Sequence, residues 1–152
     1  MMERSNYGKP DLEIEGFQLW IHRREFAEAQ DYYDGNWLQV TAHCGAPNAS
    51  VWVQGPILMV TDIYGLGKSC KDLTNGTNES AELAPMEPGL SITLRRRDAL
   101  GHFLVVVNIT PDHMNQAHRF EFESDQTCVR QLGAQCEAIV KAYGIRGAVR
   151  LS

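Results

Sequence analysis

The chain has 152 residues and a formal net charge of −5 at pH 7, with 43% hydrophobic and 22% charged residues. This composition excludes a disordered acidic tail and a coiled coil, and no apolar run approaches the roughly 18 residues that cross a bilayer. The polar N-terminus lacks the apolar core of a signal peptide, so we expect a cytoplasmic protein. The length predicts one domain over residues 11–147, with a disordered or frayed N-terminus at 1–10 and a C-terminal tail at 148–152.

The first predicted strand runs from Leu12 to Ile21. Apolar residues alternate on one face up to Ile14 and on the other face from Phe17 onward, and Gly16 lies at the change of phase. One extra residue in a strand produces such a change, so we predict a β-bulge at Gly16. Alternation bounded by Gly, Pro or Asn predicts further strands at 37–44, 49–54 with a buried run at 57–60, 81–83, 90–95, 103–107 and 119–123.

Two segments repeat apolar residues at helical spacing. The first follows Thr61, a candidate N-cap, and contains Ile63, Leu66, Cys70 and Leu73. The second follows Ser124 or Asp125, ends at Gly144, and contains Val129, Leu132, Cys136, Ile139 and Tyr143. Because tight turns join the strands, they pair antiparallel. The sequence therefore predicts an α+β fold, a twisted antiparallel sheet of six or seven strands with two helices, the C-terminal helix packed on the sheet.

Two short motifs each contain part of a known kind of binding site, one for phosphate and one for a metal ion, but neither is complete. The segment Gly65-Leu-Gly-Lys-Ser69 is similar to the end of a phosphate-binding loop, but Asp62 stands where that loop needs its first glycine. His113 and His118, beside Asp112, are too few for a metal site, which needs three or four ligands. We therefore expect no cofactor and no bound metal.

A recognisable catalytic signature is missing, because the sequence has no G-x-S-x-G elbow and no cysteine in a catalytic motif. We therefore expect a protein that is not an enzyme. A hydrolase with a spatially assembled site remains an alternative, since geometry rather than sequence order defines such sites. A small-ligand pocket lined by Trp20 and Trp52 is the other alternative.

The most distinctive local feature is the segment Asp31-Tyr32-Tyr33-Asp34-Gly35-Asn36-Trp37. Aromatic side chains beside acids suit a protein interface, because Tyr and Trp bury a large area at low entropic cost. The same residues suit a structural role, in which Asp34 and Asn36 build a turn while Trp37 or Tyr33 closes the edge of the core. From the residues alone we favour the structural interpretation.

Four segments, taken in chain order, carry a family resemblance. RREFAEAQDYYDGNWLQV contains a version of the motif D-Y-W-D-[AG]-N-W-L, and later motifs match GPILMVTDIYGL, APMEPGLSITL and HRFEFESDQTCVRQLGAQCEAIVKAYGIRG. From about residue 12 to 147, the chain resembles the WapI-like immunity proteins, a family of small bacterial proteins. It departs from the family at Tyr33, where Trp is usual, and at Gly65 and Gly67, where a well-formed amphipathic helix is expected.

The resemblance implies a protein encoded beside a contact-dependent toxin, which protects the producer by binding the toxin's C-terminal domain. An acidic surface would suit a basic toxin domain, although acids on strand faces also serve solubility. We expect no direct contact with nucleic acid or membrane, because the basic clusters are short. The expected contact residues belong to the segment above and to exposed strand faces: Asp31, Tyr32, Tyr33, Asp34, Trp37, Glu13, Glu15, Glu121 and Glu123.

Overall fold

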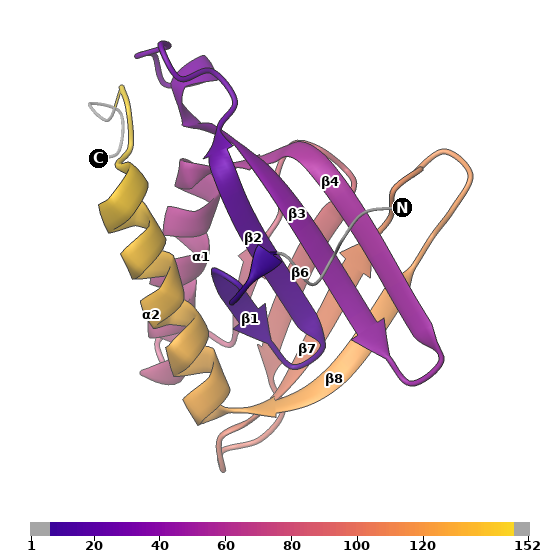
Figure 1. Ribbon diagram of the computed structural model, residues 1–152. Helices are drawn as coiled ribbons and strands as arrows, with labels where there is room; N and C mark the ends of the chain where they lie inside the picture. The colour runs from indigo at the N-terminus through magenta and orange to yellow at the C-terminus, as the bar shows by residue number, and fades with distance from the viewer. Residues whose placement is uncertain (1–6, 148–152) are drawn as a thin grey trace.

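A computed structural model describes residues 7–147, which form two α-helices and eight strands (Figure 1). The strands form two antiparallel sheets, in the orders β1-β2-β3-β4 and β5-β6-β7-β8. Their bounds are β1 Leu12–Ile14, β2 Phe17–Arg24, β3 Trp37–Ala46, β4 Ala49–Met59, β5 Ser80–Leu83, β6 Leu90–Arg96, β7 His102–Ile109 and β8 Arg119–Asp125. The helices are α1 Val60–Thr74 and α2 Gln126–Tyr143. The predicted tail at 148–152, and residues 1–6 of the predicted frayed N-terminus, lie outside the described residues.

One hydrophobic core lies between the inner faces of the two sheets and the helix pair. Phe17 of β2 and Val40 of β3 are fully buried on one side of this core, and Phe103 and Val105 of β7 are fully buried on the other. α1 packs along β5, and α2 packs along β1. Since β1 and β5 are edge strands of their sheets, the helix pair covers the side of the molecule where both edges lie (Figure 1).

The predicted α+β class, the antiparallel pairing and the two helices are confirmed. The strands form two sheets of four, whereas we predicted one sheet of six or seven. The difference arises at α1, which carries the chain from β4 in the first sheet to β5 in the second. Alternation of apolar and polar residues shows which face of a strand is buried, but it does not show which strand lies beside it.

The predicted bulge at Gly16 is wrong. Glu15 and Gly16 form a tight turn between β1 and β2, with Ile14 paired to Phe17 and with Glu15 at a φ of 51°. Directly opposed residues of an antiparallel pair point to the same face of the sheet. Ile14 and Phe17 therefore both point into the core, and the turn between them accounts for the change of phase in the sequence. A Cβ at Gly16 would lie 2.1 Å from the carbonyl oxygen of Gly45, which leaves no space for a side chain.

Both helix starts are fixed by carboxylates. α2 follows the predicted cap Asp125, whose side chain accepts a backbone N–H of the first turn at 2.9 Å, and Gly144 ends the helix at a φ of 72°. α1 begins before the predicted cap Thr61, because the Asp62 carboxylate accepts the N–H of Met59 at 2.7 Å. Within residues 7–147, neither helix is long and apolar enough to cross a membrane.

The two helices make close contact where both carry glycine. A Cβ at Gly67 would lie 2.8 Å from the Cβ of Cys136, and a Cβ at Gly133 would lie 3.4 Å from the Cβ of Cys70. The four predicted core residues of α2 are buried: Val129, Leu132, Cys136 and Ile139. Their main packing partner is α1, with further contacts from α2 to β1 and β8. Gly67 therefore allows α1 to pack tightly against α2, whereas Gly65 has no atom within 4 Å of the position of a Cβ and takes no part in this contact.

Candidate protein-binding site

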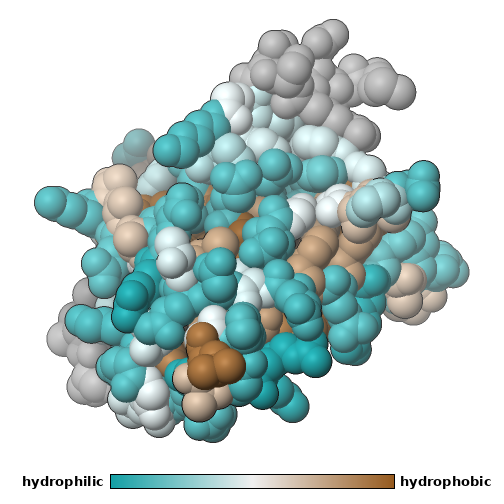
Figure 2. Space-filling view, turned by 90° about the horizontal axis from the view of Figure 1, so that it is seen from below, coloured by the Kyte–Doolittle hydropathy of each residue, from teal (hydrophilic) through white to brown (hydrophobic). Residues whose placement is uncertain are grey.

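Residues 25–36 form a loop between β2 and β3 that projects beside the C-terminal end of α2 (Figure 1). The loop carries Glu25, Glu28, Asp31 and Asp34 and no basic residue. Phe26 and Tyr33 are 49% and 63% exposed. Figure 2 views the molecule from below, at the end opposite this loop, where scattered hydrophobic areas lie among mostly hydrophilic side chains. The 25–36 loop itself combines two exposed aromatic rings with four acids.

Local hydrogen bonds fold the loop into a turn. The Asp31 carboxylate accepts the N–H of Asp34 at 3.0 Å, and the Asp31 carbonyl accepts the N–H of Gly35 at 3.1 Å. The chain then enters a 3-10 helix at Asp34–Asn36. A Cβ at Gly35 would lie 2.8 Å from the carbonyl oxygen of Ala29, so this position favours glycine. The predicted turn is present, but the side chains that bond to its backbone are those of Asp31 and Asn36, whereas we predicted Asp34 and Asn36.

A buried asparagine ties the loop to the chain that follows α2. Asn36 is fully buried, and its Nδ2 donates to the carbonyl groups of Tyr32 at 2.6 Å and Arg146 at 3.0 Å. Its Oδ1 accepts the N–H of Arg146 at 2.9 Å. The buried side-chain amide thus uses both its acceptor and its donor group on the backbone of the loop and of the segment after α2.

Two arginines add further bonds between the same segments. Arg24 donates to the carbonyl of Gly35 and to two carbonyl groups at the end of α2. Arg146 donates from Nη1 to the carbonyl groups of Ala27 and Ala29, at 2.7 Å each. Burial, followed by repulsion from Arg146, lowers the pKa of Arg24. A guanidinium also complements the negative end of the α2 dipole, which favours its place at this helix end.

The predicted residues of the 31–37 segment lie together in this loop. The rings of Tyr32 and Tyr33 meet edge to face, with 5.2 Å between their centroids and an angle of 83°. Tyr32 is half-buried, whereas Asp31, Tyr33 and Asp34 are exposed. Trp37 is half-buried at the start of β3, and its carbonyl accepts a backbone N–H from the start of the loop at 2.8 Å.

The strand acids predicted as contact residues lie elsewhere. Glu15 is in the β1–β2 turn, at the far end of β2 from the loop, and accepts a hydrogen bond from Ser124 Oγ at 2.7 Å. Glu121 and Glu123, on β8, each form an ion pair with an arginine, at 3.4 and 2.8 Å. Glu13 is half-buried on β1. The structure does not bring these acids together with the 25–36 loop.

Phe26, Arg24 and Arg146 are not among the residues that the sequence predicts for the site. Phe26 carries a local signal, because it is the one large apolar side chain in the polar stretch between Ile21 and the tyrosines. The arginines carry none, since most of their partners lie more than a hundred positions away, as with Arg24 and the carbonyl of Tyr143 at a separation of 119 residues. Only the folded chain shows that these side chains hold the loop.

The alternative ligand pocket receives little support from the aromatic rings. Trp20 and Trp52 stack on each other with 5.8 Å between centroids and an interplanar angle of 10°. Tyr7 lies 5.4 Å from Trp20, and His43 lies 4.3 Å from Trp52, by the same measure. These rings lie on the outer face of the first sheet and cover one another's faces, so they do not line a cavity between them.

The thiols are not activated for hydrolysis. Burial raises the pKa of Cys44 and Cys70 to about 12, and it also raises the pKa of Cys128 and Cys136. A nucleophilic cysteine needs a lowered pKa, since the thiolate is the reactive form. Among residues 7–147, no group of three or more His, Cys, Asp or Glu side chains is placed to hold a metal ion.

The structure is that of a small α+β protein in which hydrogen bonds hold the aromatic and acidic 25–36 loop in place. Residues 10–144 match the family described as the immunity protein WapI-like family. Because this match spans most of the sequence, the chain belongs to the WapI-like immunity protein family, and the resemblance seen in its motifs is confirmed. Comparisons with curated proteins and with solved structures give no significant match.

Proposed function

We propose that this chain protects its producing cell by forming a stoichiometric complex with the C-terminal domain of a contact-dependent toxin. In this proposal the chain covers a surface that the toxin needs and carries out no reaction itself. Membership of an immunity protein family supports the general function. The exposure of Phe26 and Tyr33 on an anchored loop supports the choice of contact surface, so we place the main contact on the 25–36 loop.

Anchoring of the loop favours binding. A loop that is ordered before it meets its partner loses less conformational entropy in the complex than a mobile loop does. Asn36 and Arg146 hold the loop through hydrogen bonds to its backbone. The rings of Phe26 and Tyr33 remain exposed, so they can contact a partner. Aromatic side chains of this kind carry a large share of the energy at protein interfaces.

The charge of the loop indicates the chemistry of the partner surface. Four carboxylates lie between residues 25 and 36, and they outnumber the two guanidinium groups, of Arg24 and Arg146, that bond to the carbonyl groups of the loop. Complementary charge accelerates association and disfavours wrong partners. We therefore infer a basic surface on the toxin domain, such as one that holds phosphate groups. The strand acids contribute less in this proposal, because Glu121 and Glu123 are already paired with arginines.

The test is coexpression with the C-terminal domain of the toxin encoded beside this chain. We expect the two proteins to copurify in equimolar amounts, and we expect the double variant Phe26→Ala, Tyr33→Ala to lower the affinity by about tenfold or more. The matched control is Met114→Ala, which removes a 78% exposed side chain from the β7–β8 loop and should leave the affinity unchanged. Absence of a complex with the unaltered chain would contradict the proposed function.

A further inference from the structure

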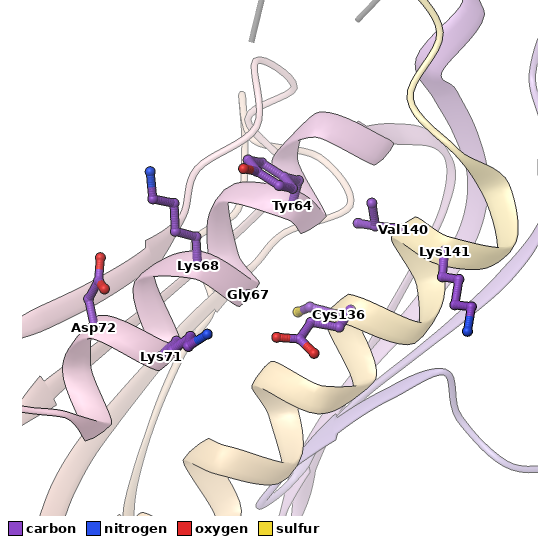
Figure 3. Close-up of a pocket in the computed structure, with 9 residues that line it drawn as sticks. Tyr64, Gly67, Lys68, Lys71, Asp72, Cys136, Val140 and Lys141 are labelled. Carbon is purple, nitrogen blue, oxygen red and sulfur yellow. The ribbon is translucent and has the colours of Figure 1, made fainter. Parts of the chain in front are cut away.

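A second surface of different chemistry lies along the outer seam between α1 and α2. A hollow of about 550 Å³ opens there, in the range of ligand-binding clefts. Figure 3 shows its lining, with Tyr64, Lys68 and Lys71 on α1 and Val140 and Lys141 on α2. Gly67, where the two helices meet, is one of the residues that line the hollow. We call this surface, together with the adjoining hollow described next, the α1–α2 furrow.

The furrow is elongated. A second hollow of about 270 Å³ shares Gly67, Lys71 and Glu137 with the first. It continues along the seam to Arg130 and Gly133 of α2. Both hollows are open to solvent on the same helix pair, so their combined shape suits a length of chain better than a compact small molecule.

The furrow is also cationic in a chain of net negative charge. The sequence contains four lysines, and three of them line the furrow: Lys68, Lys71 and Lys141. With Arg130 they outnumber the two carboxylates of the lining, Asp72 and Glu137. The ion pairs formed among residues 7–147 involve arginine or histidine, and none uses these lysines. Their charge is therefore available to a partner.

We propose that the α1–α2 furrow binds an acidic segment of a partner protein. One apolar side chain of that segment enters the hollow beside Tyr64 and Val140, and the flanking carboxylates meet Lys71 and Lys141. The apolar lining supplies contact area for the segment, and the positive charge of the lysines favours an acidic segment over a basic one. This site differs from the 25–36 loop in its elements and in its charge, so it adds a second binding surface to the proposed function.

The experiment selects ligands without assuming their sequence. A random peptide library is displayed and selected against the full chain, and the enriched peptides are then synthesised with a fluorescent label for anisotropy titration. We expect the enriched peptides to be acidic around one large apolar residue. We expect the double variant Lys71→Glu, Lys141→Glu to bind them about tenfold or more weakly than the unaltered chain.

The matched controls separate this site from general charge effects and from the 25–36 loop. Lys9→Glu changes the one lysine outside the furrow, and Tyr33→Ala changes the loop; both should leave peptide affinity unchanged. All of these side chains lie at the surface, and matching urea unfolding transitions would verify that each variant folds.

Three outcomes would overturn the proposal. The first is enrichment of peptides that are not acidic. The second is equal binding by the unaltered chain and the Lys71→Glu, Lys141→Glu variant. The third is self-association of the chain that Lys71→Glu abolishes, since this would identify a second copy as the occupant. Failure of the toxin complex with intact peptide binding would contradict only the proposed function.

Discussion

Asn36 and Arg146 exchange a reciprocal pair of hydrogen bonds across 110 residues of sequence, with Asn36 Nδ2 donating to the Arg146 carbonyl and the Arg146 N–H donating to Asn36 Oδ1. This pair makes the 25–36 loop and the segment after α2 parts of one structural unit. The fold thereby presents Tyr33 from a fixed backbone, although the loop contains no strand and only a short 3-10 helix.

Replacement of Asn36 tests that unit. We expect Asn36→Ala to lower the free energy of unfolding by about 2–3 kcal/mol, because it removes the three hydrogen bonds that this fully buried amide makes to the backbone of Tyr32 and Arg146. Urea unfolding measures the change. The control is Asn108→Ala, which alters an exposed asparagine on β7 and should cost about 0.5 kcal/mol or less. Equal losses for the two variants would show that the buried amide does not hold the loop.

Two glycines of α1 give opposite predictions for the same substitution. Gly67→Ala should lower the free energy of unfolding by about 1–3 kcal/mol, because its Cβ would lie 2.8 Å from the Cβ of Cys136. Gly65→Ala should raise it by about 0.5–1 kcal/mol, because no atom lies within 4 Å of the new Cβ and alanine favours a helix. Thermal unfolding compares the variants directly. Stabilisation by both would show that the helix contact at Gly67 is loose.

The exposed pair His102 and Asp98 predicts a dependence of stability on pH. A hydrogen bond of 2.7 Å and the charge of Asp98 raise the pKa of His102 above its ordinary value, and the same bond lowers the pKa of Asp98. The stabilisation from His102 is therefore complete below the pKa that it has in the unfolded chain, and it is lost as pH rises through the folded pKa. The stabilisation from Asp98 is lost as pH falls through its own lowered pKa.

An NMR titration of the His102 ring measures this coupling. We expect Asp98→Asn to lower the pKa of His102 towards its ordinary value, because the substitution removes the charge of the partner. Asp112→Asn, in the β7–β8 loop, is the matched control and should leave the titration of His102 unchanged. A His102 titration that does not respond to Asp98→Asn would contradict the predicted coupling.

The sequence predicts those parts of the fold that depend on neighbouring residues. The spacing of Val129, Leu132, Cys136 and Ile139 predicts the buried face of α2, and Asp125 predicts its start, because capping and helical periodicity act within a few residues. The division into two sheets could not be predicted in the same way. It depends on where α1 carries the chain, and no alternation within a strand records that path.

Some features of the candidate site can likewise be predicted from neighbouring residues, and others cannot. The acids and aromatic rings of the 31–37 segment are visible in the sequence because they are adjacent. The bonds that join Arg24 to the end of α2 and Arg146 to the loop are not visible, since each connects positions far apart in the chain. The same holds for the α1–α2 furrow, where Lys71 and Lys141 lie on different helices and approach one seam only after the helices pack.

The central claim is that the chain neutralises a toxin by occupying it, and a titration of toxin activity tests this most directly. Increasing amounts of purified chain are mixed with a fixed amount of the toxin's C-terminal domain, and the remaining toxin activity is measured after short and long incubation. We predict a linear fall that reaches zero at an equimolar amount and does not depend on time. Complete loss of activity with far less than an equimolar amount, increasing with incubation time, would show turnover and contradict the account.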